Sequence, residues 1–132
     1  MNFFLSYGAT IVPLVVLDML WIPVIAKKFY ATQMGFLFST SVNLIPAAFF
    51  YPLYALGIFL LAVVPAVTSQ SWTEALWRGA LLGLVSYGAY DLTNQVTIAG
   101  WPTLMTLVDM AWGMTVSGLT SVIAYHIILS FK

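Results

Sequence analysis

The chain has 132 residues, of which 62% are hydrophobic and 6% charged, and its four basic residues balance its four acidic ones. A soluble domain carries about 25% charged residues, so the exterior of this protein is expected to face lipid instead of water. The zero net charge and the lack of a basic patch argue against a nucleic-acid partner. The absence of cysteine excludes disulfides, thiolate metal sites and cysteine nucleophiles.

Four apolar segments follow one another along the chain, at about residues 3–26, 42–67, 75–98 and 103–131. Each exceeds the roughly 20 residues that a helix needs to cross about 30 Å of hydrocarbon. Helices are expected because open strands leave backbone groups unpaired in lipid. The sequence therefore predicts an all-α protein, with one integral membrane domain over residues 1–132 that forms a four-helix transmembrane bundle.

The segments between and before these helices carry their own signals. The N-terminus lacks the basic residues of a signal peptide, so the first segment is expected to stay as a membrane helix. Residues 29–41 are rich in phenylalanine and tyrosine and are expected to lie along the membrane interface. Ser71 and Glu74 form a capping box, and Gly100-Trp101-Pro102 predicts a tight turn. The last two segments should therefore form an antiparallel hairpin.

The orientation of the chain in the membrane cannot be assigned from its charges. Lys27 and Lys28 lie at one end of the predicted bundle, and Arg78 and Lys132 lie at the other. The positive-inside rule thus gives an even count. Dual insertion and a weakly specified single topology are both consistent with this balance.

Three of the four acidic residues fall inside predicted spans, and they share one depth. Asp18 lies nine residues before Lys27, Asp91 nine before Gly100, and Asp109 nine after Gly100. At 1.5 Å per residue, each carboxylate lies about 13 Å below the same membrane surface. One aspartate at the centre of a membrane helix costs about 2.5–3.5 kcal/mol to insert. Three at one depth favour a functional site over a purely structural role, in which polar groups join helices at about 0.6 kcal/mol each.

Other residues are expected near this aspartate layer. Tyr87 and Asn94 lie one helical turn on either side of Asp91, and Asn43 begins the second span at the same side. The motif D-M-x-W occurs twice, at residues 18–21 and 109–112. Because the two helices should be antiparallel, the repeat suggests a pseudo-two-fold axis in the membrane plane, as in inverted-repeat transporters.

The single histidine does not belong to this layer. His126 lies 17 residues beyond Asp109, so it is expected near the opposite membrane surface. This position argues against a His-carboxylate di-iron or zinc centre. The sequence also lacks a Ser-His-Asp constellation, a P-loop and a dinucleotide fingerprint.

Several short motifs resemble a bacterial membrane protein family, domain of unknown function 2177. They are Lys28-Phe29-Tyr30, Phe49-Phe50-Tyr51-Pro52-Leu53-Tyr54, Tyr90-Asp91-Leu92-Thr93-Asn94, Trp101-Pro102 and Asp109-Met110-Ala111-Trp112-Gly113. The resemblance covers nearly the whole chain and implies a multi-pass protein of the bacterial inner membrane, with no assigned activity. It also implies that Asp18, Trp21, Asp91, Asn94, Asp109 and Trp112 are signature positions.

These features favour a small carrier or permeation unit for protons, cations or a small polar or cationic solute. Four helices enclose little space, so a homodimer is expected to help. The expected partners are the lipid bilayer and an ion or small-molecule ligand, with no resident cofactor beyond a cation that the aspartates would hold; whether a metal binds is left open. The expected ligand- or proton-binding residues are Asp18, Trp21, Asn43, Tyr87, Asp91, Asn94, Asp109 and Trp112.

Two other functions are consistent with the sequence. One is a membrane enzyme acting on a lipid or isoprenoid, in which the carboxylates serve as acid and base or hold Mg²⁺. It predicts a groove open to lipid at the aspartate layer. The other is an accessory subunit whose polar layer only joins helices, and it predicts that aspartate-to-asparagine changes lower stability without affecting any ligand.

Overall fold

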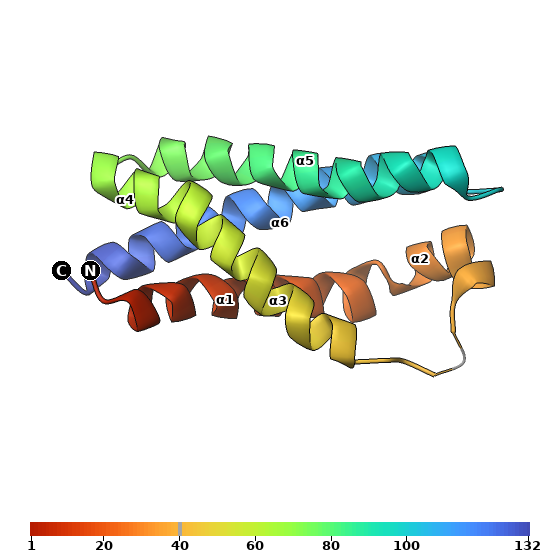
Figure 1. The fold of residues 1–132 in the computed structure, drawn as a ribbon, viewed down its shortest axis with the longest axis horizontal. Helices are drawn as coiled ribbons and strands as arrows, with labels where there is room; N and C mark the ends of the chain where they lie inside the picture. Colours follow the sequence, from red (N-terminus) through yellow and green to blue (C-terminus); the bar gives the residue numbers. More distant parts are fainter. Residues whose placement is uncertain (40) are drawn as a thin grey trace.

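The computed structural model describes residues 1–39 and 41–132, and within these residues the chain is helical without any β-strand. Figure 1 shows the arrangement of the helices. In chain order they are α1 (Phe3–Leu20), the π-helical turn η1 (Trp21–Ile25), α2 (Lys27–Met34), the 3₁₀ turn η2 (Gly35–Leu37), α3 (Ile45–Ile58), the π-helical turn η3 (Phe59–Val63), α4 (Val64–Ser69), α5 (Trp72–Thr97) and α6 (Thr103–Ser130).

Three continuous helical stretches are long enough and apolar enough to cross a membrane, at Phe3–Ile25, Ile45–Ser69 and Thr103–Ser130. They match three of the four predicted spans. The fourth, α5, has 26 residues and therefore a length of about 39 Å, which is sufficient to cross. Its composition is less apolar because it includes Glu74, Arg78 and Asp91, so three candidate spans are found where the sequence predicted four.

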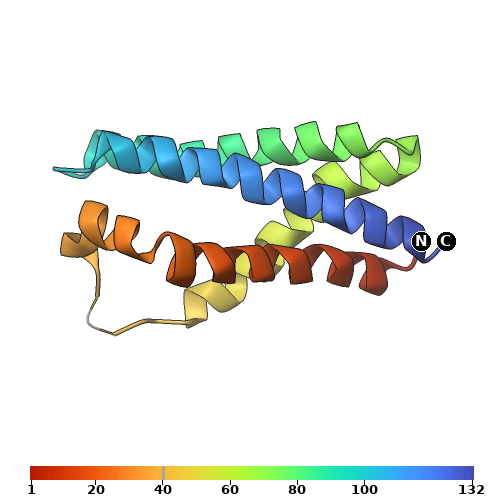
Figure 2. The same ribbon diagram turned by 180° about the vertical axis from the view of Figure 1, so that it is seen from behind.

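The turns between the helices and the chain termini lie at two opposite ends of the molecule. The chain termini and the turn between α4 and α5 lie at one end, and α2 and the turn between α5 and α6 lie at the other (Figures 1 and 2). Consequently α1 and α6 run antiparallel, as do α5 and α6. The predicted interfacial segment after the first helix is formed by α2 and η2 at the second end.

The tightest helix pair is α5 and α6, which lie side by side in both views (Figures 1 and 2). Small residues allow this approach. A Cβ atom on Gly83 would overlap the carbonyl of Gly113, and one on Gly79 would overlap the carbonyl of Ser117. Small residues at four-residue spacing are the usual means by which membrane helices come into close contact.

The predicted N-cap of α5 is confirmed, but only half of the capping box forms, because the Ser71 backbone N–H donates to the Ala66 carbonyl and not to Glu74. The Ser71 hydroxyl accepts a hydrogen bond from the Glu74 backbone N–H at 3.2 Å. Glu74 in turn accepts from Ser69 and from Arg78, and the Arg78 Nε to Glu74 Oε1 distance is 2.7 Å. These hydrogen bonds lower the pKa of Glu74. At the other end of α5, Gly100 has a φ of 77°, the left-handed conformation that the predicted tight turn requires.

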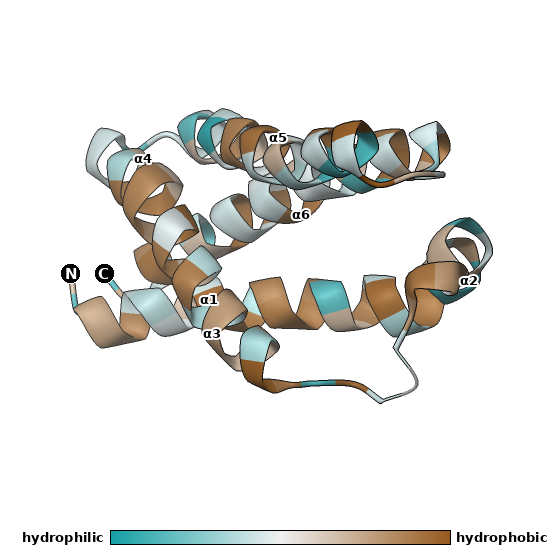
Figure 3. Cartoon of the chain, turned by 45° about the vertical axis from the view of Figure 1, so that its right-hand side comes forward, coloured by the Kyte–Doolittle hydropathy of each residue, from teal (hydrophilic) through white to brown (hydrophobic). Residues whose placement is uncertain are grey.

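Hydrophobic residues occur along every long helix, with hydrophilic ones between them (Figure 3), and many of the large hydrophobic side chains are exposed. Large side chains such as Phe4, Phe49 and Val96 are 83%, 74% and 85% exposed. Soluble monomers rarely expose contiguous apolar surface on this scale. The exterior therefore suits contact with lipid chains, as the composition predicted.

Candidate functional site

Asp18 is held in the bundle by two hydrogen-bond donors from distant helices. It lies on α1, and its side chain is almost fully buried. One carboxylate oxygen accepts from Trp112 Nε1 on α6 at 3.0 Å, and the other accepts from the Tyr51 hydroxyl on α3 at 3.0 Å. Two donors directed at one carboxylate satisfy much of its hydrogen-bonding capacity.

Asp109 has an equivalent but indirect arrangement. It lies on α6, and its Oδ1 accepts from the Tyr30 hydroxyl on α2 at 2.9 Å. The same hydroxyl accepts from Trp21 Nε1 at 2.8 Å. Trp21 therefore supports Asp109 through Tyr30, just as Trp112 supports Asp18 directly.

The two D-M-x-W motifs are thus connected reciprocally. The tryptophan of each motif donates a hydrogen bond to the aspartate of the other, directly for Trp112 and through the Tyr30 hydroxyl for Trp21. The Trp21 and Trp112 rings also stack, with centroids 4.4 Å apart and planes 8° from parallel. Since α1 and α6 are antiparallel, this exchange fits the pseudo-two-fold relation suggested by the repeated motif (Figures 1 and 2). We refer to Asp18, Trp21, Tyr30, Asp109 and Trp112 as the reciprocal network.

Tyr30 is the one member of this network that lies outside the predicted spans. Burial, followed by the negative charge of Asp109, raises the pKa of Tyr30. Its hydroxyl therefore keeps its proton and can donate it in the hydrogen bond to Asp109. The π-helical turn at Trp21–Ile25, which contains Pro23, connects α1 to the helix that carries Tyr30.

Asp91 differs from the other two aspartates because it has no donor. Its side chain is 0% exposed, and neither carboxyl oxygen has a hydrogen-bond partner among the described residues. The carboxyl group faces that of Asp109 on the neighbouring helix, closely enough for the two to share a hydrogen bond when one carries a proton. Asp91 and Asp109 therefore form a carboxyl pair, with Asp18 apart from it.

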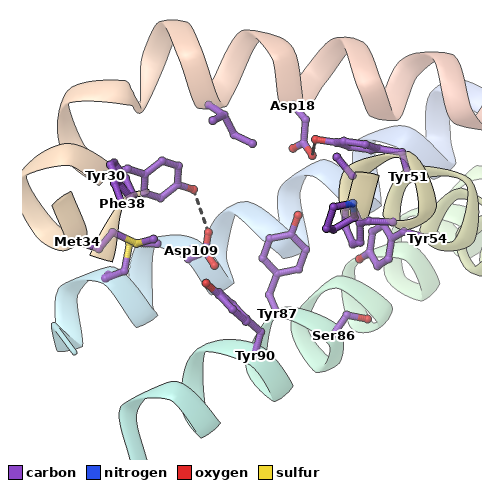
Figure 4. A pocket seen from close by; sticks show the side chains of 15 residues that line it. Asp18, Tyr30, Met34, Phe38, Tyr51, Tyr54, Ser86, Tyr87, Tyr90 and Asp109 are labelled. Carbon is purple, nitrogen blue, oxygen red and sulfur yellow. Dashed lines mark hydrogen bonds between the residues drawn. The ribbon is translucent and has the colours of Figure 1, made fainter. Parts of the chain in front are cut away.

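A cavity of about 640 Å³ opens beside this pair. Figure 4 shows Tyr30 pointing from α2 toward Asp109 and Tyr51 pointing from α3 toward Asp18. We call this space the tyrosine cavity, since five tyrosines are among its lining residues. The lining comprises Asp18, Ile22, Tyr30, Met34, Phe38, Pro46, Ala47, Phe50, Tyr51, Tyr54, Ser86, Tyr87, Tyr90, Met105 and Asp109.

The chemistry of this lining is acidic and aromatic. Asp18 and Asp109 supply carboxylates, and no lysine, arginine or histidine is among the lining residues. Tyr87 rises from α5 between the two aspartates (Figure 4). Its ring packs where a side chain on Gly113 would otherwise be, which accounts for the glycine that follows Trp112. Aromatic faces and carboxylates both attract cations.

The sequence-predicted site residues fall into three groups in the structure. Asp18, Tyr87 and Asp109 line the cavity, and Trp21, Asp91 and Trp112 lie behind it in contact with the aspartates or with Tyr30. The structure does not bring Asn43 and Asn94 into the cavity lining. Asn43 is exposed before α3, where its side chain accepts from the Ile45 backbone N–H at 3.1 Å, and Asn94 is half-buried near the end of α5.

The three aspartates do not form one group that could hold a metal ion. Over residues 1–39 and 41–132, no three histidine, cysteine, aspartate or glutamate side chains come together in an arrangement that could hold a metal ion. The physical reason is that Trp112 and Tyr51 hold the Asp18 carboxylate, whereas Asp91 faces Asp109. A common depth predicted from residue counts does not by itself bring side chains into contact.

Sequence reasoning missed Tyr30, Tyr51, Tyr54 and Tyr90 as site residues. A signal for two of them was present, because Ala47, Phe50, Tyr51 and Tyr54 recur at helical spacing and mark one face of α3. Nothing in the sequence placed that face opposite Asp18. Tyr30 depends on how α2 folds back after the π-helical turn, which has no simple sequence signature.

The helices, their apolar exterior and the buried aspartates define an all-helical membrane protein. The chain belongs to the family described as "Predicted membrane protein (DUF2177)", which it matches over residues 3–126. This confirms the resemblance drawn from the short motifs. No curated protein and no solved structure matches the chain.

Proposed function

We propose that this protein binds a lipophilic organic cation in the tyrosine cavity and carries it across the membrane. The observation that supports this is the joint presence of five tyrosines and two carboxylates in a cavity without any cationic lining residue. A cation over an aromatic face gains about 0.5–2 kcal/mol, more when water is excluded. Buried carboxylates supply the opposite charge that such a ligand needs.

The size and shape of the cavity agree with a ligand of this kind. A volume of about 640 Å³ lies within the range of about 300–1,000 Å³ that small-molecule sites occupy. Phe38, Phe50 and Tyr90 line the cavity and are 52%, 42% and 50% exposed, so its rim is aromatic and open. A lipophilic cation could therefore enter the cavity from the membrane without first crossing a layer of bulk water.

The proposal includes a fourth span and places the aspartates within the bilayer. α5 lies against α6 (Figures 1 and 2), and Asp91 is fully buried. A helix in this position needs less apolar composition than one surrounded by lipid. In this arrangement the chain is one four-span membrane domain, and α2 lies at the interface between membrane and water.

The proposal has two further parts, the location of the protein and its oligomeric state. The bacterial inner membrane is the location that the motif resemblance implied. A homodimer would close the open side of the cavity with a second copy and enlarge the path for a solute. The choice of a carrier over an enzyme or an accessory subunit rests on the acidic and aromatic lining.

The test is binding of tetraphenylphosphonium to the purified protein, compared with tetraphenylborate, which has nearly the same shape and the opposite charge. We expect only the cation to bind, and Asp109→Asn to weaken it by at least about tenfold, or 1.4 kcal/mol. Glu74→Gln is the matched control, because Glu74 is an acidic residue that lies outside the cavity. Equal binding of both ions, or an unchanged affinity in Asp109→Asn, would contradict a cation site.

Transport is tested separately with proteoliposomes. Wild-type vesicles are expected to accumulate or release tetraphenylphosphonium faster than empty vesicles, and Asp109→Asn vesicles are expected to match the empty ones. Binding without any flux would leave a cation receptor in place of a carrier.

A further inference from the structure

We propose that Asp91 and Asp109 share one proton when the tyrosine cavity is empty, and release it when a cation binds against Asp109. The inference rests on the proposed function, because the cation is the ligand proposed there. It adds the means by which cation binding is coupled to proton movement. Its basis is the position of two carboxyl groups that the reciprocal network does not fully satisfy.

The unpartnered oxygens of Asp91 are the first observation. Asp91 is 0% exposed, and both its carboxyl oxygens lack a donor among the described residues. An ionised carboxylate buried in this way is costly, since neither water nor a donor replaces its hydration. The Asp109 carboxyl that it faces can replace the missing partner if one of the two groups carries a proton.

The groups around the pair leave no other source of compensation. From α2 the Tyr30 hydroxyl donates to Asp109, and from α5 the nearby titratable groups are Tyr87 and Tyr90. From α1 the nearest is Asp18, itself acidic. No lysine, arginine or histidine of the described chain hydrogen-bonds or ion-pairs with either member of the pair.

The charge of the site can then be followed through binding. In the empty state the pair holds one O–H bond and has a net charge of −1. When a monovalent cation binds, that O–H bond breaks, the proton passes to water, and the pair becomes −2. The bound cation returns the sum to −1, so the buried site keeps the same net charge in both states.

The geometry also assigns different roles to the two carboxyl groups. Asp109 lines the cavity and can contact the ligand directly, whereas Asp91 does not line it and lies on the neighbouring helix. Asp91 is therefore a positioning residue that sets the proton content of the pair, and Asp109 is the group that meets the cation. Asp18 also lines the cavity but takes no part in the proton exchange, since Trp112 and Tyr51 already donate to it.

The experiment is titration calorimetry of tetraphenylphosphonium into the purified full chain, in two buffers of different ionisation enthalpy at one pH. The difference in apparent heat gives the number of protons released. We expect about one proton per bound cation for the wild type and for Glu74→Gln. Asp91→Asn is expected to bind the cation with no proton release, because Asp109 is then a single ionised carboxylate.

A ligand-free measurement separates this inference from the proposed function. The infrared spectrum of the empty wild-type protein should contain a protonated-carboxyl band that Asp91→Asn removes, because the remaining Asp109 carboxylate still accepts from Tyr30. If the band is present and no cation binds, the proton pair stands and the proposed function is wrong. Cation binding without proton release, or a wild-type spectrum without the band, would overturn the inference.

Discussion

Trp21 and Trp112 stack with their ring centroids 4.4 Å apart, although 91 positions separate them in the chain. Each indole is three residues beyond an aspartate, and each supports the aspartate of the other motif. The reciprocal network therefore joins α1, α2 and α6 through charges that membrane insertion alone would disfavour. The two tryptophans should contribute unequally to the free energy of unfolding, and this difference can be measured.

Trp112→Phe is expected to destabilise the protein more than Trp21→Phe. Both changes remove one indole from the stack, but only Trp112→Phe removes a donor from a buried carboxylate directly. A hydrogen bond to a charged group contributes about 1.5–3 kcal/mol, and a neutral one about 0.5–1.5 kcal/mol. Equilibrium unfolding of the two variants in detergent gives the difference, which we expect to be on the order of 1 kcal/mol. Equal losses would mean that stacking, and not the carboxylate hydrogen bond, dominates.

Gly83→Ala is expected to force α5 and α6 apart. Its Cβ would overlap the carbonyl of Gly113, a backbone atom that cannot move alone. Overpacking of this kind costs about 1–3 kcal/mol. Gly57→Ala in α3 is the matched control, because a Cβ there has nothing within 4 Å and alanine favours helix. Thermal unfolding followed by circular dichroism should show a lower midpoint for Gly83→Ala only; a lower midpoint in both would indicate a general effect of removing glycine.

Much of the fold follows from the sequence because hydrophobic length and helix-end chemistry are local properties. The N-cap at Ser71 and the turn at Gly100 set the bounds of α5 and the start of α6, and both appear as predicted. The difference lies in α5, which was predicted as a span and is not among the three candidate spans. Asp91 on this helix is buried within the bundle, and burial of this kind is a tertiary property that a hydropathy count does not include.

The sequence identified the charged residues of the site, but it did not predict which side chains contact them. Counting residues placed three aspartates at one depth, but it could not show that Asp91 pairs with Asp109 while Asp18 takes donors from Trp112 and Tyr51. These choices depend on helix rotation and on the oblique crossing of α3 over α1 (Figure 1). A one-residue change in register would rotate each side chain by about 100°, which no residue count constrains.

Tyr90 provides a test of aromatic recognition at the rim of the cavity. It lines the cavity, is 50% exposed, and meets Trp101 edge-on with centroids 5.9 Å apart. Tyr90→Phe keeps a ring and should bind tetraphenylphosphonium nearly as well as the wild type. Tyr90→Leu keeps apolar area but removes the ring, and we expect a two- to fivefold weaker affinity, equivalent to about 0.5–1 kcal/mol. If leucine and phenylalanine bind alike, the rim contributes apolar contact and no cation–π attraction.

Single cysteines at Gln70 and Ala99 would test whether α5 crosses the membrane. The native chain has no cysteine, so each introduced thiol is unique. Gln70 lies in the turn before α5 and Ala99 in the turn after it, at opposite ends of the bundle (Figure 1). If α5 spans, an impermeant maleimide added outside sealed vesicles should label only one of the two in a population with a single orientation.

A cysteine at Lys28 should behave like the one at Ala99, because α2 lies at the same end of the bundle as the turn between α5 and α6 (Figure 1). In a population with dual orientation, each site should be labelled in a complementary fraction of molecules. Full labelling of both Gln70→Cys and Ala99→Cys from one side would instead place α5 outside the hydrocarbon and would leave Asp91 without its membrane setting.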